Sequence, residues 1–400
     1  MNTTLYENID WVGAVDSAIR DFHGYDAERG ATYNAYLVRD EKTALIDTVK
    51  TPFTAELLRN VAALTDPSRV DYVVCNHAEL DHAGGLPEVM RRMPRATLVC
   101  NKKCAVTLGE HFDTSSWKIR CVATGETIPL GRRTLQFIET PMFHWPESMF
   151  TYVPQQRLLF SMDAFGQHYA TAERFDDEAD LSILMDEAKT YYANIIMPYA
   201  KAVLTALGRL AGLEVGMIAP SHGLIWRRHG AEILAAYRDW ARHRQQPKVL
   251  VIYDTMWEST TAMAEAIIAG AGQPGVRTSL VHIRRSNLTR IAAEVLDAAT
   301  VAFGSSTLNR GMMPMAAAVL SYWEGLRPQN KAALSFGSYG WGKGGPEAVD
   351  RALRTLQWEI LRKPLLAHYR PTPAVLAECR QAGELLAQRA AISAVSRDSA

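Results

Sequence analysis

The sequence predicts an α/β protein with two domains of different architecture. Short apolar runs separated by turns fill residues 1–245, whereas strand, loop and helix alternate regularly over residues 246–400. A polar stretch that ends in proline, ARHRQQP at 241–247, separates the two patterns and is typical of a linker. We therefore place one domain at 1–245 and a second at 246–400, and we expect a doubly wound parallel sheet in the second.

Composition excludes several classes of function. The 400 residues include 43 Lys+Arg and 43 Asp+Glu, and this balance gives no reason to expect nucleic acid or a membrane surface as partner. We find no apolar run long enough to span a bilayer and no signal peptide. The five cysteines form no CxxC pair, which argues against a disulfide framework or a rubredoxin-type iron centre. We expect a cytoplasmic protein in a reducing environment.

The apolar runs of the N-terminal domain predict strands whose end loops carry the functional residues. These runs are YNAYLV (33–38), KTALIDT (42–48), VDYVVCN (70–76), ATLVC (96–100), LQFIET (135–140) and RLLFSMD (157–163). The third run leads into CNHAELDHAGG, which holds four candidate metal ligands within six positions: His77, Glu79, Asp81 and His82. In a tight loop this spacing directs several side chains toward one point, and the paired glycines let the backbone turn beneath them.

Three later segments each add one candidate ligand after an apolar run. His144 lies in FHWPESM, Asp163 in LFSMDAFG and His222 in APSHGLIW. A single histidine is more often structural than a ligand. Together with the first loop, however, the segments supply four histidines and three carboxylates, which suffices for two metals that share one carboxylate. We expect the histidines that lie outside these segments to be structural or surface residues: His111, His168, His229, His243, His282 and His368.

The motifs HxExDH, HWPES, SMDAFG and SHGLIW resemble, in this order, the diiron domain of the flavodiiron proteins. The resemblance covers residues 20–230 and implies a metallo-β-lactamase-like αββα sandwich with two non-haem irons. It implies that the iron nearer the flavin is held by His77, Glu79 and His144. It implies that Asp163 bridges to a second iron held by Asp81, His82 and His222. The family is not uniform in whether the histidine at the position of His82 touches iron.

Glu79 stands where hydrolases with a loop of this shape, His-x-His-x-Asp-His, carry a histidine. Imidazole-rich sites suit zinc, which has no redox chemistry, whereas carboxylates are harder ligands that suit iron. Three carboxylates on two ferrous ions leave a net charge of about +1, which favours oxidation to the ferric state. Glu79 therefore favours electron transfer to a bound gas. The alternative is a zinc hydrolase with an appended flavodoxin-like module; the complete ligand set argues against an electron carrier with a vestigial metal domain.

Further residues of this domain are candidates for the surroundings of the metals. The segment FHGYDAERGATYNAYL also resembles the family, and His23 and Tyr25 in it are candidate catalytic residues that would donate hydrogen bonds or protons; simple packing is an equal alternative. Tyr191 or Tyr192 is expected to pack in the core, with an approach to the pocket as the alternative. Glu147 is expected either beside the ligands or at the surface.

The C-terminal domain begins with KVLVIYD (248–254), a continuous apolar run typical of a strand covered on both faces. The hydroxyl-rich loop TMWEST (255–260) follows it and leads into a helical run. Backbone N–H groups at such a helix start favour a phosphate, although similar turns also simply cap helices. Further predicted strands lie in TSLVHIRR (278–285), TVAFGSS (300–306) and KAALSFGS (331–338).

Two more loops, GSSTLNRG (304–311) and FGSYGWGKGG (336–345), follow apolar strands, and ligands of doubly wound sheets bind outside such strand ends. With the first loop they resemble the flavodoxin-like domain of the flavodiiron proteins, which binds FMN. The ring would pack against Trp257, Tyr339 or Trp341, with packing inside the protein as an even alternative. The candidate FMN-binding residues are Thr255, Met256, Trp257, Ser259, Thr260, Ser305, Ser306, Thr307, Leu308, Asn309, Ser338, Tyr339, Gly340, Trp341 and Gly342.

Glu258 occupies a position where plain flavodoxins have glycine, and we expect its carboxylate to point away from the phosphate. The resemblance, which spans nearly the whole chain, implies a reductase that converts O2 to water, NO to N2O, or both, with O2 favoured. Two ferrous ions and a reduced flavin together hold the four electrons that O2 needs. It also implies an external electron donor such as rubredoxin or a reductase, and a head-to-tail homodimer or a dimer of dimers.

Overall fold

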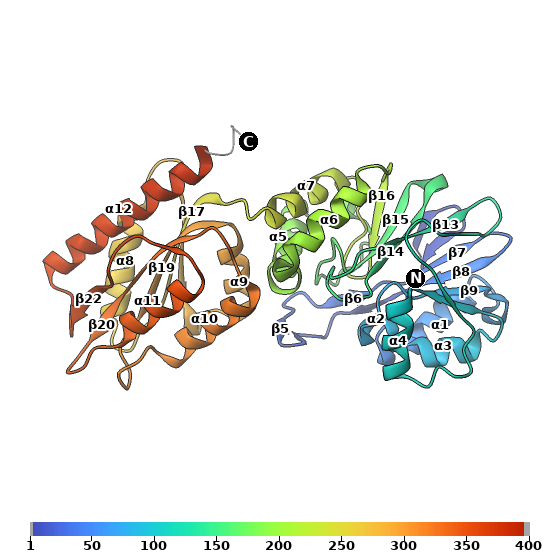
Figure 1. Ribbon diagram of the computed structural model, residues 1–400, viewed down its shortest axis with the longest axis horizontal. Coiled ribbons are helices and arrows are strands. Elements are labelled where there is room, and N and C mark those ends of the chain that lie inside the picture. Colours follow the sequence, from blue (N-terminus) through green and yellow to red (C-terminus); the bar gives the residue numbers. More distant parts are fainter. Residues whose placement is uncertain (1–2, 396–400) are drawn as a thin grey trace. The chain divides into compact units, whose positions relative to one another are not determined.

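The computed structural model describes residues 3–395 and divides into two compact units, Met1–Arg238 and Asp239–Ala400 (Figure 1). The polar stretch predicted as a linker is shorter than expected. Its first residue ends helix α7 (Gly230–Ala241), and its last two residues begin strand β17 (Gln246–Asp254). Gln246 is drawn into the strand because it already pairs with Ala298 of the neighbouring strand.

The N-terminal unit contains two main sheets that pack face to face (Figure 1). Within the described residues, the first sheet has the order β1 (Thr3–Tyr6), β2 (Ile9–Trp11), β7 (Tyr36–Arg39), β8 (Thr43–Ile46), β9 (Tyr72–Val74), β10 (Thr97–Cys100) and β11 (Ile119–Cys121). The second has the order β12 (Thr127–Pro129), β13 (Thr134–Glu139), β14 (Met149–Val153), β15 (Leu158–Met162) and β16 (Met217–Pro220).

Alternating side chains along the first sheet create the layers. Leu37 and Val73 belong to a core with the helices α1 (Thr54–Ala62), α3 (Leu86–Arg92) and α4 (Lys102–His111). Their neighbours Val38 and Val74 belong instead to the core between the sheets. The helices α5 (Leu181–Tyr191), α6 (Ala200–Leu210) and α7 lie on the side of the second sheet (Figure 1). The predicted αββα sandwich is confirmed.

Two small hairpins precede the third strand of the first sheet. Strand β3 (Ala14–Asp16) pairs with β6 (Ala31–Tyr33), and β4 (Asp21–Phe22) pairs with β5 (Tyr25–Asp26). His23 lies in the tight turn of the second hairpin with a φ of +56°. The hairpins therefore carry the two candidate catalytic residues on a short, exposed connection.

The C-terminal unit is a parallel sheet covered on both faces. Its order is β18 (Arg277–His282), β17, β19 (Ala298–Ser305), β20 (Ala332–Tyr339) and β21 (Glu359–Ile360), and β22 (Leu365–His368) also pairs with β20. Helices α8 (Ser259–Ala271) and α12 (Pro373–Val395) share one core with β17. Helices α9 (Leu288–Asp297), α10 (Pro314–Leu326) and α11 (Gly345–Thr355) share the opposite core. The predicted doubly wound sheet is confirmed.

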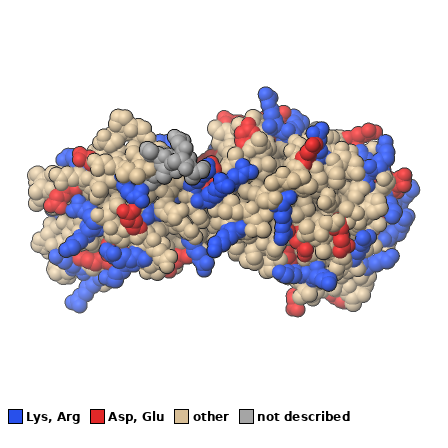
Figure 2. Space-filling view, turned by 45° about the horizontal axis from the view of Figure 1, so that its top comes forward, with Lys and Arg blue, Asp and Glu red and all other residues tan. Residues whose placement is uncertain are grey.

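Charged side chains of both signs are interspersed over the face shown in Figure 2, as their equal numbers suggest. Among the described residues, we find no helix that combines the length and the apolar character needed to cross a membrane.

Candidate metal and flavin sites

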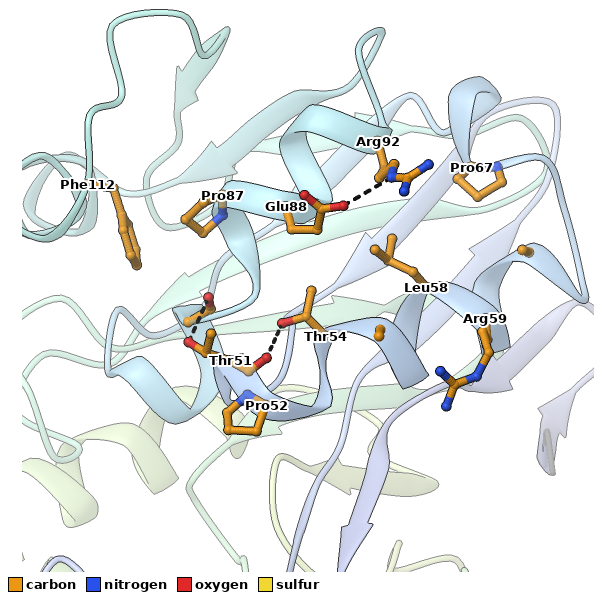
Figure 3. A pocket seen from close by; sticks show the side chains of 13 residues that line it. Thr51, Pro52, Thr54, Leu58, Arg59, Pro67, Pro87, Glu88, Arg92 and Phe112 are labelled. Carbon is orange, nitrogen blue, oxygen red and sulfur yellow. Dashed lines mark hydrogen bonds and ion pairs between the residues drawn. The ribbon is translucent and has the colours of Figure 1, made fainter.

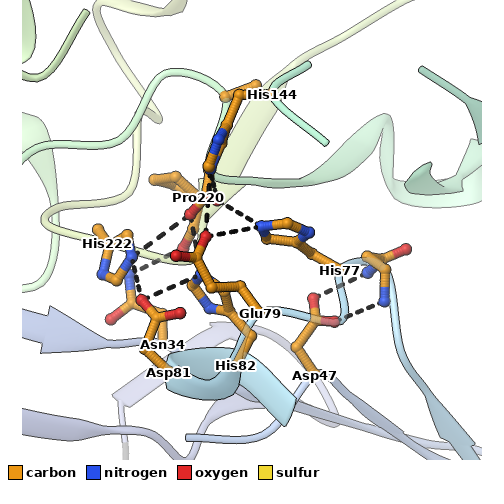
Figure 4. Close-up of polar contacts among 12 residues, drawn as sticks. Asn34, Asp47, His77, Glu79, Asp81, His82, His144, Pro220 and His222 are labelled. Carbon is orange, nitrogen blue, oxygen red and sulfur yellow. Dashed lines mark hydrogen bonds and ion pairs between the residues drawn. The ribbon is translucent and has the colours of Figure 1, made fainter. Parts of the chain in front are cut away.

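All seven predicted metal ligands lie around one point at the edge of the sandwich. Figure 4 labels His77, Glu79, Asp81, His82, His144 and His222. Strands β13, β15 and β16 run in the same direction, so the loops that carry His144, Asp163 and His222 leave one edge of the second sheet. Strand β9 of the first sheet brings the HxExDH segment to the same place. Asp81 and His82 of this segment lie in a one-turn helix, α2 (Leu80–Ala83), where the sequence predicted a tight loop.

The first group of donors contains His77, Glu79 and His144. Glu79 Oε2 lies 3.1 Å from His77 Nε2 and 3.3 Å from His144 Nε2. Metal–ligand bonds of about 2.1 Å place neighbouring ligand atoms of an octahedral ion about 3 Å apart. The spacing of these three atoms therefore suits one metal ion.

The second group contains Asp81, His82 and His222. Asp81 Oδ2 lies 3.1 Å from His222 Nε2 and 3.3 Å from His82 Nε2. These side chains are deeply buried, whereas 20% of the Glu79 side chain and 13% of the His144 side chain are exposed. The first group therefore lies nearer to solvent than the second.

Asp163 lies between the two groups and offers one oxygen to each. Its Oδ2 is 3.2 Å from His77 Nε2 and 3.1 Å from His144 Nε2. Its Oδ1 is 2.9 Å from His82 Nε2 and 3.3 Å from His222 Nε2. A carboxylate with one oxygen facing each group is the arrangement that a bridge between two metals requires.

Several of these buried atoms have no hydrogen-bond partner within the described part of the chain. They are Asp81 Oδ1, His82 Nε2 and Asp163 Oδ1. His82 Nε2 lies close to Asp163 Oδ1, but the two atoms are not aligned for a hydrogen bond. Unpaired buried polar atoms are costly unless something else satisfies them. The donor set therefore fits a pair of metal ions better than it fits a self-contained hydrogen-bond network.

Two of the imidazole rings are oriented by bonds at their other nitrogen. The Nδ1–H of His77 donates to Glu147 Oε1 at 2.8 Å, and that of His222 donates to the Thr32 carbonyl at 2.6 Å. Glu147 is buried, so its predicted place beside the ligands is correct and the surface alternative is wrong. His82 Nδ1 has no such partner among the described residues. A fixed Nδ1 leaves Nε2 free to face a metal.

The ionisation of the group also favours cations. Burial lowers the pKa of His222, but the carboxylates of Asp163 and Asp81 outweigh it and raise the pKa to about 10. Burial raises the pKa of Glu79, and hydrogen bonds from His144 and His77 outweigh it, so that the pKa falls below its usual value. The carboxylates are therefore anionic, and metal ions would displace protons from the imidazoles of His77, His144 and His222.

The other candidates of this unit separate into two sets. Tyr191 lies beside the second group, with its ring centroid 5.9 Å from that of His222, whereas Tyr192 packs 5.0 Å from Tyr237. His23 Nε2 lies 3.7 Å from Glu79 Oε1. Burial, followed by the charge of Glu79, raises the pKa of Tyr25. Both hairpin residues therefore approach the more exposed group.

His168 was expected to be structural or at the surface, and it is buried close to the donors. Its ring centroid lies 5.5 Å from that of His222 and 5.0 Å from that of Tyr191. Burial lowers its pKa to about 3, so the ring is neutral. Its position five residues after Asp163, in SMDAFGQH, was the available signal in the sequence.

A separate open groove of about 770 Å³ lies between α1 and α3 (Figure 3). Thr51 and Thr54 line one part of it, and Glu88 and Arg92 pair at 3.0 Å on another. The described residues that line the groove include none of the metal donors, so the groove is not part of the metal site.

The predicted FMN loops meet at the carboxyl edge of the parallel sheet. The hydroxyls of Thr260, Ser306 and Ser338 form a buried triangle with sides of 2.9, 3.1 and 3.3 Å. The buried Oγ1 atoms of Thr255 and Thr261 have no partner within the described residues. Free hydroxyls at the start of α8 suit a phosphate at the positive end of the helix. The loops therefore fit a flavin mononucleotide.

Some of the predicted FMN residues also bind other parts of the loops. Ser305 Oγ accepts from the Met313 N–H, and Thr307 Oγ1 accepts from the Gly345 N–H. Asn309 lies in a tight turn closed by mutual backbone bonds between Leu308 and Gly311. These residues shape the loop.

The aromatic candidates differ in their exposure. Trp257 is 87% and Trp341 97% exposed, whereas Tyr339 packs against His368 with ring centroids 5.1 Å apart. Glu258 is exposed at the start of α8, in agreement with its expected outward direction. The two tryptophans therefore offer large apolar faces next to the flavin loops.

Comparisons with known proteins agree with both halves. A family model described as ODP family beta lactamase matches residues 31–223, and the flavodoxin model matches residues 251–383. The chain is 42% identical to the nitric oxide reductase of Moorella thermoacetica, over 97% of this chain and 98% of the relative. It is 40% identical to the anaerobic nitric oxide reductase flavorubredoxin of Aeromonas hydrophila, over 98% of this chain and 80% of the relative.

Two solved structures share the whole fold. The flavodiiron protein from Giardia intestinalis matches with a TM-score of 0.97 and 36% sequence identity. The match covers 99% of this chain and 98% of that protein's chain. The chain belongs to the flavodiiron protein family. The rubredoxin:oxygen oxidoreductase of Desulfovibrio gigas matches with a TM-score of 0.95 and 36% sequence identity. The match covers 98% of this chain and 99% of that protein's chain. Membership of the flavodiiron family, together with the flavodoxin match, implies a non-haem diiron centre and FMN as cofactors.

Glu147 provides a first test of how this flavodiiron protein holds its metals. Glu147→Ala would leave the buried Nδ1 of His77 without its acceptor, and we expect roughly 10- to 100-fold weaker iron binding. Glu147→Gln keeps an acceptor oxygen and should lose less. Iron retained after dialysis against a graded series of chelator concentrations measures the effect. Wild-type retention in the alanine variant would show that this bond does not orient His77.

Proposed function

We propose that this protein is a flavodiiron reductase that reduces O2 to water, NO to N2O, or both. The observation that carries this proposal is the pair of histidine and carboxylate groups around Asp163, next in sequence to a flavin-binding unit. The similar proteins named above are a nitric oxide reductase and a rubredoxin:oxygen oxidoreductase, and they support both substrates. When bound, the irons and the flavin supply the electrons that either gas requires.

We propose that one iron is held by His77, Glu79 and His144 and the other by Asp81, His82 and His222, with Asp163 as the bridge. The ring orientation of His77 and His222 supports their part in this assignment. The partial exposure of Glu79 and His144 makes the first iron the one that electrons from outside would reach. Burial of the second group excludes water from that side of the pocket.

His23, Tyr25, Tyr191 and His168 lie near the metal donors and would supply the polar groups of the gas pocket. His23 is the exposed member of this set and would connect the pocket to solvent. His168 is neutral, so it neither repels the metal ions nor adds charge to the pocket.

A zinc hydrolase is the less supported alternative, because the donor set includes three carboxylates and the chain contains a flavin-binding unit. An external electron donor, such as rubredoxin or a reductase, would load the flavin. We also propose the head-to-tail homodimer that the family resemblance implies, which sedimentation of the holoprotein tests.

The decisive experiment is analysis of the purified protein for metal and flavin, followed by anaerobic assays with O2 and NO in parallel. Two irons and one FMN per chain with turnover of either gas would support the proposal. Zinc in place of iron, reproduced after expression in iron-rich medium, would favour the hydrolase. Iron and FMN without turnover of either gas under a chemical reductant would contradict the reductase.

A further inference from the structure

The turn that carries Asp163 contains a residue with an unusual backbone conformation. Strand β15 ends at Met162, and a hydrogen bond of 3.1 Å from the Gly166 N–H to the Asp163 carbonyl closes the turn that follows. Within this turn, Phe165 has a φ of +69°. A bulky residue with positive φ is disfavoured and persists only where surrounding contacts hold it. The direction of the Asp163 carboxylate therefore depends on what binds Phe165.

Both backbone polar groups of Phe165 are bound by side chains. Its carbonyl accepts hydrogen bonds from Gln167 Nε2 and from Trp226 Nε1, each at 2.8 Å. Its N–H donates to the hydroxyl oxygen of Tyr237 at 3.0 Å. Gln167 and Trp226 lie in or directly after segments that carry a metal donor, whereas Tyr237 lies on helix α7, outside all of these segments. The N–H of Phe165 is thus bound by a residue from a distant element.

The ring of Tyr237 also contacts the loops of two metal donors. Its centroid lies 4.7 Å from that of Phe165 and 6.2 Å from that of Phe143, the residue before His144. All three rings are fully buried. Buried rings are close-packed, so a shift of one of them moves its neighbours. Tyr237 therefore connects α7 to the loop of Asp163 by a hydrogen bond and to both loops by packing.

We propose that Tyr237 is a positioning residue that holds the carboxylate of Asp163 between the two groups of metal donors. This inference rests on the proposed role of Asp163 as the bridge. The hydroxyl of Tyr237 binds the N–H of Phe165, the turn keeps its conformation, and each oxygen of Asp163 faces its own group.

Loss of the hydroxyl would act on the bridge through the turn. The buried N–H of Phe165 would lose its partner, which is costly, and the turn would relax toward a less strained backbone. The carboxylate of Asp163 would rotate with the turn, so that its two oxygens would no longer face both groups equally well. Iron binding and the geometry of the bridge would change together.

The test uses Tyr237→Phe, which removes the hydroxyl and keeps the ring. We expect amide hydrogen exchange in the peptide that contains Phe165 to become about three- to tenfold faster, as for the loss of one hydrogen bond. Iron affinity, measured by retention against a graded series of chelator concentrations, should fall about tenfold, the lower end for residues that orient metal ligands. The Mössbauer spectrum of the bound iron should also change, because it reports on the geometry of the bridge.

Tyr152→Phe is the matched control. Tyr152 is also buried in this unit, and its hydroxyl donates to the carbonyl of Glu214, a residue that contributes no metal donor. This variant loses one buried hydrogen bond as well, so its thermal stability should fall by a similar amount. It should keep the iron affinity and the Mössbauer spectrum of the wild type. Melting curves followed by circular dichroism check that each variant is folded.

Wild-type iron affinity and an unchanged spectrum in Tyr237→Phe would overturn the proposal, and so would equal losses in the control. Faster exchange at Phe165 with unchanged iron binding would overturn it too, because the hydrogen bond would then not position the bridge. None of these measurements needs turnover, so absence of gas reduction by the wild type would contradict the proposed function without changing this result. Retention of both irons with a wild-type spectrum in Asp163→Asn would overturn the bridge itself and this inference with it.

Discussion

Asp163→Asn is expected to abolish the diiron centre and to reduce gas turnover by roughly 10³-fold or more, since metal charge stabilisation is worth several kcal/mol. Each oxygen of Asp163 faces a different group of donors, so its loss affects both metals at once. Asparagine preserves the size of the side chain but removes its charge and one of its two equivalent acceptors. Iron content by mass spectrometry and anaerobic assays with O2 and NO measure the effect.

Asp176→Asn is the matched control for this variant. Asp176 is also a buried carboxylate of the same unit, but it accepts backbone N–H groups from Arg228 and His229. This variant should lower the thermal stability and retain both irons. Two irons with normal turnover in Asp163→Asn would exclude Asp163 as an essential bridge.

Glu79→His is expected to shift the metal content of the protein from iron toward zinc. We also expect gas turnover to fall at least roughly 100-fold, because replacing even a residue that only orients a metal ligand can cost that much. Histidine would replace an anionic oxygen with a neutral nitrogen, raise the net charge of the metal centre by one and disfavour the ferric state. Metal content and the midpoint potential followed by electron paramagnetic resonance measure the change.

Glu79→Gln separates the two causes of this effect. Glutamine removes the charge without adding an imidazole, so its midpoint potential should rise in the same direction while zinc gains no nitrogen ligand. Unchanged oxidase activity in Glu79→His would refute the role assigned to the carboxylate.

Local patterns in the sequence were sufficient to predict the architecture of both domains. Alternating and continuous apolar runs predicted strands such as β13 and β17, because side-chain periodicity reports which faces are buried. The functional residues at strand ends could also be recognised from the sequence, because parallel strands direct their carboxyl ends to one edge of the sheet. These features depend on neighbouring residues and on general rules of sheet topology.

Features that depend on distant packing were not predictable in the same way. The sequence left the position of Glu147 open, because its burial depends on the imidazole of His77, which lies seventy residues earlier. His168 follows the SMDAFG motif, but only the fold places it beside Tyr191 and His222. Tyr191 ends helix α5 and Tyr192 begins the π-helical turn Tyr192–Ile196, so only the helical geometry decides which ring lies beside His222.

The distribution of the metal donors along the chain also determines the order of assembly. The donors come from separate segments, which start with His77 and end with His222, and the two sheets must close before these segments meet. A nascent chain that has not yet released His222 from the ribosome lacks one donor of the second group. We therefore expect iron to bind late, to a unit that has already folded.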